Sequence, residues 1–225
     1  MVRIVCLERD SVDARLRRPA CDHEWIEYPA TRPDQVVERL LGAQIAITNK
    51  APMPAAVIDA LPDLRLVAIS ATGTNVVDLE ACRRRGVAVC NIRGYAVHTV
   101  PEHTLMLLLA LSRNLVAYRL SVQAGRWQRT EQFCLFDHPI RDLHGATLGV
   151  VGGGSLGGGV IRLAEAFGMR VLRAERKGAA TLRSGHVAFA EVLRECDALT
   201  LHCPLTPETQ GLIGDAELRA MKPSA

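Results

Sequence analysis

The sequence has few aromatic residues, which limits how its core can be built. Phe, Trp and Tyr make up only 4% of the 225 residues, whereas 48% of the residues are hydrophobic. That hydrophobic share is typical of a globular protein. We therefore expect a core of mainly aliphatic side chains, in a chain long enough for one large or two smaller domains.

Paired cysteines are also missing. The chain has seven cysteines, and no two of them form a C-x-x-C pair. An odd number of cysteines without paired spacing argues against a disulfide framework and against a zinc site. The sequence thus predicts free thiols, no metal site and a reducing compartment, which makes the cytoplasm the expected location.

The chain has neither a strong excess of charge nor a long hydrophobic run. Lys and Arg number 27 against 24 Asp and Glu, a net charge of +3. Such a small and dispersed charge predicts neither a nucleic-acid partner nor an anionic membrane surface. The longest apolar stretch, Leu105 to Leu111, is far shorter than the roughly 20 residues that cross a bilayer. The strand-like residues 1–8 are too short for a signal peptide.

Glycine, by contrast, is concentrated in one stretch, residues 147–161. A short apolar run of strand type, residues 147–151, leads into Gly152, Gly154 and Gly157, and apolar residues then recur at helical spacing. A G-x-G-x-x-G match between a strand and a helix indicates a dinucleotide site. The first glycine allows a tight turn, the second lets the backbone approach a pyrophosphate, and the third lets the helix pack closely.

An acid follows the glycine motif at the expected spacing. A second strand, residues 169–172, leads to Glu175, which lies 18 residues after Gly157. A carboxylate at about this distance accepts hydrogen bonds from a ribose in dinucleotide-binding domains. The alternative is a glycine-rich loop in an ordinary α/β domain, with Glu175 as a solvated residue at a strand end.

The first half of the chain alternates strands with helices. We expect strands at 2–8, 44–48, 64–70 and 87–91, and helices at 34–42, 54–61 and 77–85. This alternation predicts a parallel sheet covered on both faces. Because ligands bind beyond the carboxyl ends of such strands, the loops Asn49-Lys50 and Thr72-Gly73-Thr74 are candidate ligand sites.

The alternation of short strands and helices stops in the middle of the chain. Apolar spacing predicts one helix over residues 99–123, about 35 Å long at 1.5 Å per residue, which Gly125 would end. Residues 126–144 show no period and are expected to connect the two halves. Beyond Glu175, we expect a helix at 189–194, a strand at 196–202 and a helix at 215–221. The predicted domains are residues 1–98 and 99–225.

Several motifs together resemble one enzyme family. Besides the glycine stretch, the motifs are residues 71–75, 91–95, 102–104, 125–127, 143–145, 201–206 and 221–223. With these motifs in this order, the chain is similar to the D-isomer-specific 2-hydroxyacid dehydrogenases, and within them to glycerate dehydrogenases, also called hydroxypyruvate reductases. The resemblance implies a flavodoxin-like substrate domain, a Rossmann domain for the cofactor, and hydride transfer between a nicotinamide and a small 2-hydroxy or 2-keto acid.

The resemblance also implies which residues bind the substrate. Thr72, Gly73 and Thr74 match the loop whose backbone N–H groups hold the substrate carboxylate, and Thr72 also lies near the nicotinamide in the family. Lys50 stands where the second loop of the substrate domain is expected to contact the substrate. A simple turn-forming role for the two threonines is the alternative.

For the cofactor, the family pattern adds positions to the three glycines. Ser155 and Leu156 match the pyrophosphate contacts, and Thr104 matches a position that faces the cofactor. Cys203 and Pro204 match a loop beneath the adenosine. Glu175 matches the ribose acid and favours NAD, because a carboxylate repels a 2′-phosphate. Arg176 and Lys177 keep NADP as the alternative.

The sequence also departs from the family pattern. The arginine, glutamate and histidine that catalyse the reaction in the family would lie beyond Ala225, so no residue here is assigned a catalytic role. Gly153, Gly158 and Gly159 replace larger residues, and we expect the two helical ones to weaken the helix start.

We therefore expect an incomplete oxidoreductase with weak or no turnover, and relatives that form homodimers through the long helix. The alternatives are a dinucleotide- or partner-binding module without chemistry, and a non-functional fragment.

Overall fold

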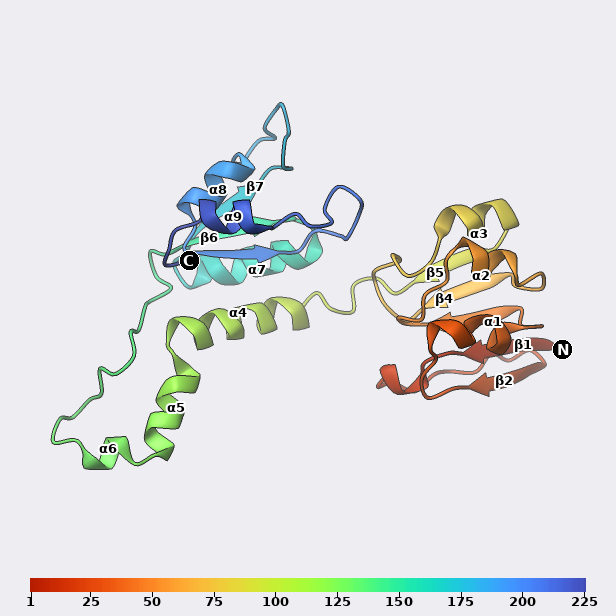
Figure 1. The fold of residues 1–225 in the computed structure, drawn as a ribbon, viewed down its shortest axis with the longest axis horizontal. Helices are drawn as coiled ribbons and strands as arrows, with labels where there is room; N and C mark the ends of the chain where they lie inside the picture. Colours follow the sequence, from red (N-terminus) through yellow and green to blue (C-terminus); the bar gives the residue numbers. More distant parts are fainter. The chain divides into compact units, whose positions relative to one another are not determined.

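The computed structural model describes residues 1–225, which form two compact units, Met1–Gly94 and Tyr95–Ala225 (Figure 1). Each unit contains one sheet, and every strand pair in both sheets is parallel. This confirms the predicted α/β class. The second unit begins four residues before the domain start expected from the sequence, in the loop that precedes its first helix.

The first unit has a five-stranded sheet in the order β2-β1-β3-β4-β5. This is the strand order of flavodoxin-like folds, as expected. Four strands fall within the ranges given by the sequence pattern. The strands are β1 (Val2–Cys6), β2 (His23–Glu27), β3 (Ile45–Thr48), β4 (Leu66–Ile69) and β5 (Ala88–Asn91).

Short helices connect these strands and bury an aliphatic core. The largest fully buried side chains include Leu7, Leu40 and Ile58, which confirms the expected lack of aromatic residues in this core. The last helix has both ends capped, because Asp78 accepts from the Ala81 N–H over 2.8 Å and Gly86 ends it. The helices are η1 (Arg9–Ser11), η2 (Pro33–Gln35), α1 (Val36–Leu40), α2 (Ala55–Asp59) and α3 (Leu79–Arg85).

The sequence pattern did not reveal β2. Its residues, HEWIE, do not alternate between apolar and polar side chains, and none of them is buried. The strand lies at the edge of the sheet, where one side pairs with β1 and the other side has no neighbouring strand. An edge strand needs little hydrophobic patterning, because its pairing partner supplies the backbone hydrogen bonds.

The loop after β3 is fixed by a carboxylate from the end of β1. Glu8 accepts hydrogen bonds from the backbone N–H groups of Asn49, Lys50 and Ala51 over 2.8–2.9 Å. It also accepts one from the hydroxyl of the buried Thr48 over 2.9 Å. Burial opposes ionisation of this carboxyl, but the four donors outweigh it and hold the Glu8 pKa below its usual range. Lys50 is therefore held at the strand end through its own backbone.

The second unit has a three-stranded sheet in the order β7-β6-β8. All five residues of the central strand are buried, and hydrophobic clusters cover both of its faces. Leu148 and Val150 pack with α7 on one face, while Val151 packs with α8 on the other. The elements are β6 (Thr147–Val151), α7 (Ser155–Ala166), β7 (Arg170–Ala174), α8 (Phe189–Glu195), β8 (Ala198–Leu201) and α9 (Asp215–Ala220).

The prediction of one helix over residues 99–123 was wrong. Two helices, α4 (Thr99–Ser112) and α5 (Leu115–Gln123), meet at a bend of 58° (Figure 1). Asn114 adopts a left-handed conformation with φ +49°, which asparagine tolerates better than most residues. Its side chain donates to the Pro139 carbonyl, and Arg113 pairs with Asp142. Contacts with residues 139–142 thus stabilise a break that helical spacing alone cannot reveal.

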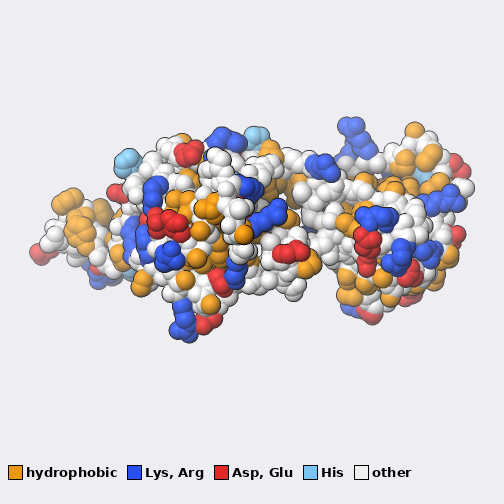
Figure 2. Space-filling view, turned by 90° about the horizontal axis from the view of Figure 1, so that it is seen from above, with side chains coloured by type: hydrophobic (Ala, Val, Ile, Leu, Met, Phe, Trp, Pro, Cys, Tyr) orange, Lys and Arg blue, Asp and Glu red, His pale blue; other side chains and the backbone are white.

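Beyond the bend, the chain carries exposed hydrophobic side chains. Gly125 follows the end of α5 as expected, and a short helix that the sequence did not predict, α6 (Arg126–Arg129), comes next. Leu111, Val116 and Leu120 are 60–75% exposed on α4 and α5. Figure 2 shows hydrophobic side chains over the part of the second unit that carries α5 and α6, and cationic side chains interspersed with anionic ones elsewhere.

No single helix is both long and apolar enough to cross a membrane, although α4 and α5 taken together would satisfy the length and composition required.

Gly159 allows α4 and α7 to approach each other closely. A Cβ atom at Gly159 would lie 2.6 Å from the Pro101 Cγ and 3.4 Å from the Val97 carbonyl oxygen. The neighbouring Gly158 has no such contact, since the nearest atom to its Cβ position would be an Arg162 nitrogen at 3.9 Å. The expectation that both glycines merely weaken the helix was therefore incomplete, because Gly159 has a packing role.

This difference predicts opposite effects of alanine at two adjacent positions. Gly158→Ala should stabilise the second unit by about 0.4–1 kcal/mol, since it lowers the entropy of the unfolded chain without a clash. Gly159→Ala should destabilise it by roughly 1–3 kcal/mol, since α4 and α7 must move apart. Calorimetric melting of both variants tests this, and equal effects would contradict the proposed packing role of Gly159.

The hydrogen bonds of Glu8 predict a pH-dependent stability of the first unit. Because its folded pKa lies below the ordinary value of 4.5, its contribution is present above pH 4.5 and is lost as the pH falls through the folded pKa. Glu8→Gln should cost roughly 1–3 kcal/mol at pH 7, and the difference from wild type should shrink below pH 4.5. Urea unfolding at pH 7 and pH 3.5 measures this, with exposed Glu38→Gln as the control.

Candidate functional site

Three parallel strands of the second unit end at one edge, where the predicted cofactor residues gather. Val151 is paired with Ala174 on one side and with Leu201 on the other. The residues that follow these strand ends are therefore neighbours at the same edge. They are Gly152, Glu175 and the segment from His202 to Pro204. Carboxyl ends of parallel strands are where open α/β sheets bind ligands.

The first and third glycines of the motif make a turn that no other residue could form. Gly152 has φ +91°, and a Cβ there would lie 2.6 Å from the Cys203 nitrogen. A Cβ at Gly157 would overlap the Gly152 carbonyl oxygen, so α7 packs directly on the turn. Both findings agree with the roles expected from the spacing.

The second glycine faces open space. Gly154 is exposed and extended, and no protein atom lies within 4 Å of the position that its Cβ would take. It immediately precedes α7, whose first backbone hydrogen bond runs from the Gly158 N–H to the Gly154 carbonyl over 2.7 Å. The N–H groups of Ser155 and Leu156 thus have no intrahelical acceptor. A bare backbone with free N–H groups at a helix start fits a pyrophosphate.

Glu175 is buried, and its carboxylate is already hydrogen-bonded. It accepts from the Arg176 N–H over 2.9 Å, from the Arg183 N–H over 3.0 Å and from the Arg183 Nε over 2.8 Å. These donors, with the Arg183 guanidinium first, lower the pKa of Glu175 to about 2. The acid is therefore ionised at neutral pH. The sequence pattern did not indicate Arg183 as a partner of Glu175, because a separation of eight residues follows no known spacing rule.

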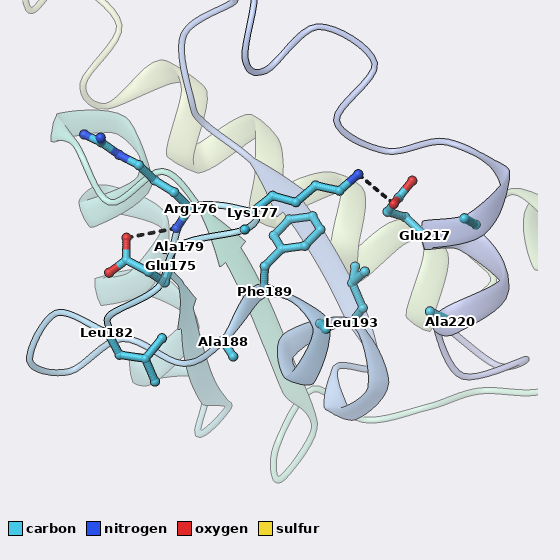
Figure 3. Close-up of a pocket in the computed structure, with 13 residues that line it drawn as sticks. Glu175, Arg176, Lys177, Ala179, Leu182, Ala188, Phe189, Leu193, Glu217 and Ala220 are labelled. Atoms are coloured by element: carbon cyan, nitrogen blue, oxygen red, sulfur yellow. Dashed lines mark hydrogen bonds and ion pairs between the residues drawn. The ribbon is translucent and has the colours of Figure 1, made fainter.

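A cavity of about 320 Å³ opens beside Glu175 (Figure 3). Its floor is apolar and includes Phe189 and Leu193 from α8. Lys177 extends above Phe189 to Glu217 on α9, and the two side chains form an ion pair of 2.8 Å. The cavity thus has an apolar floor and a charged rim, a combination common in sites for small organic ligands.

The remaining predicted cofactor residues lie in the same unit. Cys203 is partly buried against the hydrophobic cluster of α8, and Pro204 is exposed with its carbonyl accepting from Thr209 over 2.6 Å. Thr104 lies on α4 and is half-buried, and its hydroxyl donates to the Val100 carbonyl one turn earlier. The Thr104 hydroxyl therefore has a helical partner of its own.

The predicted substrate residues lie in the first unit, at the ends of adjacent strands. Thr48 is paired with Ile69, so Lys50 and the Thr72-Gly73-Thr74 loop follow neighbouring strand ends. The Thr72 carbonyl accepts from the Asn91 amide over 2.7 Å, which fixes the start of that loop. None of the loop's three N–H groups donates to a protein atom. Free N–H groups in a turn suit a carboxylate.

The structure shows no group of three or more His, Cys, Asp or Glu side chains arranged to hold a metal ion. All seven cysteines are free thiols, and Cys6, Cys82 and Cys196 are buried.

Comparison with known families identifies the second unit. A profile described as the NAD binding domain of D-isomer specific 2-hydroxyacid dehydrogenases matches residues 105–225. The match covers the glycine turn, Glu175 and the Cys203 loop. Homologues named for 2-hydroxy-acid chemistry match the rest of the chain as well.

Two relatives align over nearly the whole chain. Glycerate dehydrogenase of Methylorubrum extorquens is 46% identical over 224 residues, which cover 99% of this chain and 70% of that protein. A putative 2-hydroxyacid dehydrogenase of Haemophilus influenzae is 44% identical, covering 100% and 72%. Hydroxypyruvate reductase of Blautia hydrogenotrophica is 33% identical, and the aligned residues cover 85% of this chain and 61% of that protein.

A solved structure supports the same assignment. The TT0316 protein from Thermus thermophilus superimposes with a TM-score of 0.79 at 31% identity, covering 98% of this chain and 71% of that one. Family profile, sequence relatives and fold thus agree, and the chain belongs to the D-isomer-specific 2-hydroxyacid dehydrogenase family.

Proposed function

We propose that this chain is the dinucleotide- and substrate-binding part of an NAD-linked oxidoreductase that acts on the CH–OH group of a small 2-hydroxy acid of the glycerate and hydroxypyruvate type. The observation that carries the proposal is the turn at Gly152, Gly154 and Gly157, with Glu175 at the next strand end. Two relatives with named activities, a glycerate dehydrogenase and a hydroxypyruvate reductase, support the substrate class.

The cofactor would be held by the strand-end residues of the second unit. The N–H groups of Ser155 and Leu156 bind the pyrophosphate, with Gly154 leaving room for it. Glu175 accepts the ribose hydroxyls, Cys203 and Pro204 lie beneath the adenosine, and Thr104 faces the cofactor. When bound, the nicotinamide supplies or accepts the hydride. The ionised Glu175 favours NAD over NADP.

The substrate carboxylate would be bound by the first unit. The free N–H groups of Thr72, Gly73 and Thr74 donate to its oxygens, and the exposed Lys50 adds a positive charge. Glu8 assists because its carboxylate accepts a hydrogen bond from the Lys50 N–H and so fixes the backbone of Lys50. The combination selects a small anionic substrate, because N–H donors and a cation both stabilise negative charge.

Turnover by these 225 residues alone should be weak or absent. The arginine, glutamate and histidine that the family uses for substrate binding and proton transfer match no residues of this chain. A dinucleotide- or partner-binding module without chemistry is the second candidate, favoured by the same free helix N-terminus. We also propose that the protein works in the cytoplasm, in keeping with its seven free thiols.

Gly154→Ala tests the cofactor site. Because nothing lies within 4 Å of its Cβ position, the variant should fold with an unchanged melting temperature. The added methyl group would stand where the pyrophosphate approaches, so NADH binding should weaken about tenfold, or 1.4 kcal/mol. Calorimetric titration of wild type, Gly154→Ala and the equally open Gly153→Ala with NADH measures this.

Lack of NADH binding by a folded wild type would refute the cofactor site. Assays of hydroxypyruvate reduction with the same samples test for residual chemistry, and slow but measurable turnover would favour the oxidoreductase over the binding module. Binding with no turnover agrees with both the incomplete enzyme and the binding module, and rapid turnover would refute the expectation of weak activity.

The apolar surface of α4 and α5 supports a homodimer. We propose that a second copy covers Leu111, Val116 and Leu120, since side chains of this size are rarely left 60–75% exposed together. Replacing Leu111 and Val116 by glutamate should yield a monomer in light-scattering chromatography, with little change in melting of the first unit. A monomeric wild type would exclude this proposal, and Leu182→Glu, at an exposed leucine elsewhere, is the control.

A further inference from the structure

Arg183 is joined to the acid that the proposed function assigns to the ribose. Its Nε and its backbone N–H both donate to the same Glu175 oxygen, over 2.8 and 3.0 Å. The Glu175 side chain is 4% exposed, whereas the Arg183 side chain is 59% exposed. The terminal nitrogens of the guanidinium donate to no protein atom. Arg183 thus places a cation with free donors at the surface of a buried carboxylate.

The other two cations of this segment, Lys177 and Arg176, differ in whether they form an ion pair. Lys177 is held by Glu217 over 2.8 Å and extends across the apolar floor of the cavity (Figure 3). Arg176 points away from that ion pair, is exposed, and has no side-chain partner. Glu208 is close enough to Arg176 for their charges to interact, so the charges around Glu175 comprise two carboxylates and two arginines with free donors, and the edge of the site is not net negative.

These charges bear on the adenosine 2′ position of a dinucleotide. An acid that accepts ribose hydroxyls disfavours a 2′-phosphate, while a nearby arginine accommodates one. Arginine binds phosphate through charge-assisted hydrogen bonds in a planar fork. This chain has both elements in contact, so the repulsion expected from Glu175 alone is compensated within the protein.

We propose that Arg183 determines cofactor specificity at the adenosine 2′ position. It offsets the charge of Glu175 and donates hydrogen bonds to a 2′-phosphate. The site therefore accepts the phosphorylated dinucleotide as well as NAD, with only a small difference in affinity between the two. The proposal rests on the proposed function, because it takes Glu175 to be the ribose acid. It concerns the loop of residues 176–183 and requires no hydride transfer.

Binding of two adenosine fragments tests the proposal without catalysis. The nucleotide 5′-AMP carries a free 2′-hydroxyl, and 2′,5′-ADP differs from it only by the 2′-phosphate. Both can be titrated calorimetrically into the 225-residue protein. For wild type, we expect the two dissociation constants to differ by less than about tenfold. In Arg183→Met, the dissociation constant of 2′,5′-ADP divided by that of 5′-AMP should rise about tenfold, because one charge-assisted hydrogen bond to the 2′-phosphate is lost.

Three further variants make the result specific. Arg194→Met removes an exposed arginine on α8 that has no charged partner, and it should leave the ratio unchanged. Arg183→Lys keeps the charge without the fork, so its ratio should lie between those of wild type and Arg183→Met. Glu175→Gln removes the repulsion and should shift the preference towards 2′,5′-ADP.

An unchanged ratio in folded Arg183→Met and Arg183→Lys, with both nucleotides still bound, would overturn this proposal alone. Failure of folded wild type to bind either nucleotide would overturn the cofactor site of the proposed function, and this proposal with it. A tenfold rise confined to the Arg183 variants supports the assignment.

Discussion

The close contact between α7 and the turn at Gly152 is the constraint on which the second unit depends. With no side chain at Gly157, the helix rests directly on the Gly152 carbonyl, and with none at Gly152 the turn fits against the Cys203 backbone. The same contact fixes where α7 begins, and hence where its free N–H groups point. Packing and the proposed phosphate site therefore have one origin, and a side chain at either Gly152 or Gly157 would disturb both.

Charge organises both units in a comparable way. In each, a carboxylate at the end of a strand gathers backbone N–H groups from a neighbouring loop: Glu8 holds residues 49–51, and Glu175 holds Arg176 and Arg183. A carboxylate can accept several hydrogen bonds, so one acid can shape a whole loop. Glu8 uses this capacity to support the backbone of Lys50. Glu175 accepts three hydrogen bonds from Arg176 and Arg183, which leaves one acceptor position for the ribose hydroxyls of the proposed cofactor site.

Much of this architecture was predictable because its signals are local. Strands with apolar runs, the helix ended by Gly86, and the strand–glycine–helix unit at 147–166 depend on neighbouring residues alone. The features that escaped prediction depend on distant partners. β2 pairs at a sheet edge without an apolar face, and the break at Asn114 depends on residues 139–142. Arg183 reaches Glu175 across a loop whose course no spacing rule describes.

The contact between Gly159 and Pro101 links two helices through positions that are 58 residues apart in the chain. Since any side chain at 159 must displace the proline ring, the residues at these two positions restrict each other's choice. Across the family, a larger residue at 159 should therefore accompany a smaller or displaced one at 101. Gly159, which departs from the family pattern, is then one member of a correlated pair. Substitutions at position 159 are therefore interpretable only together with those at position 101.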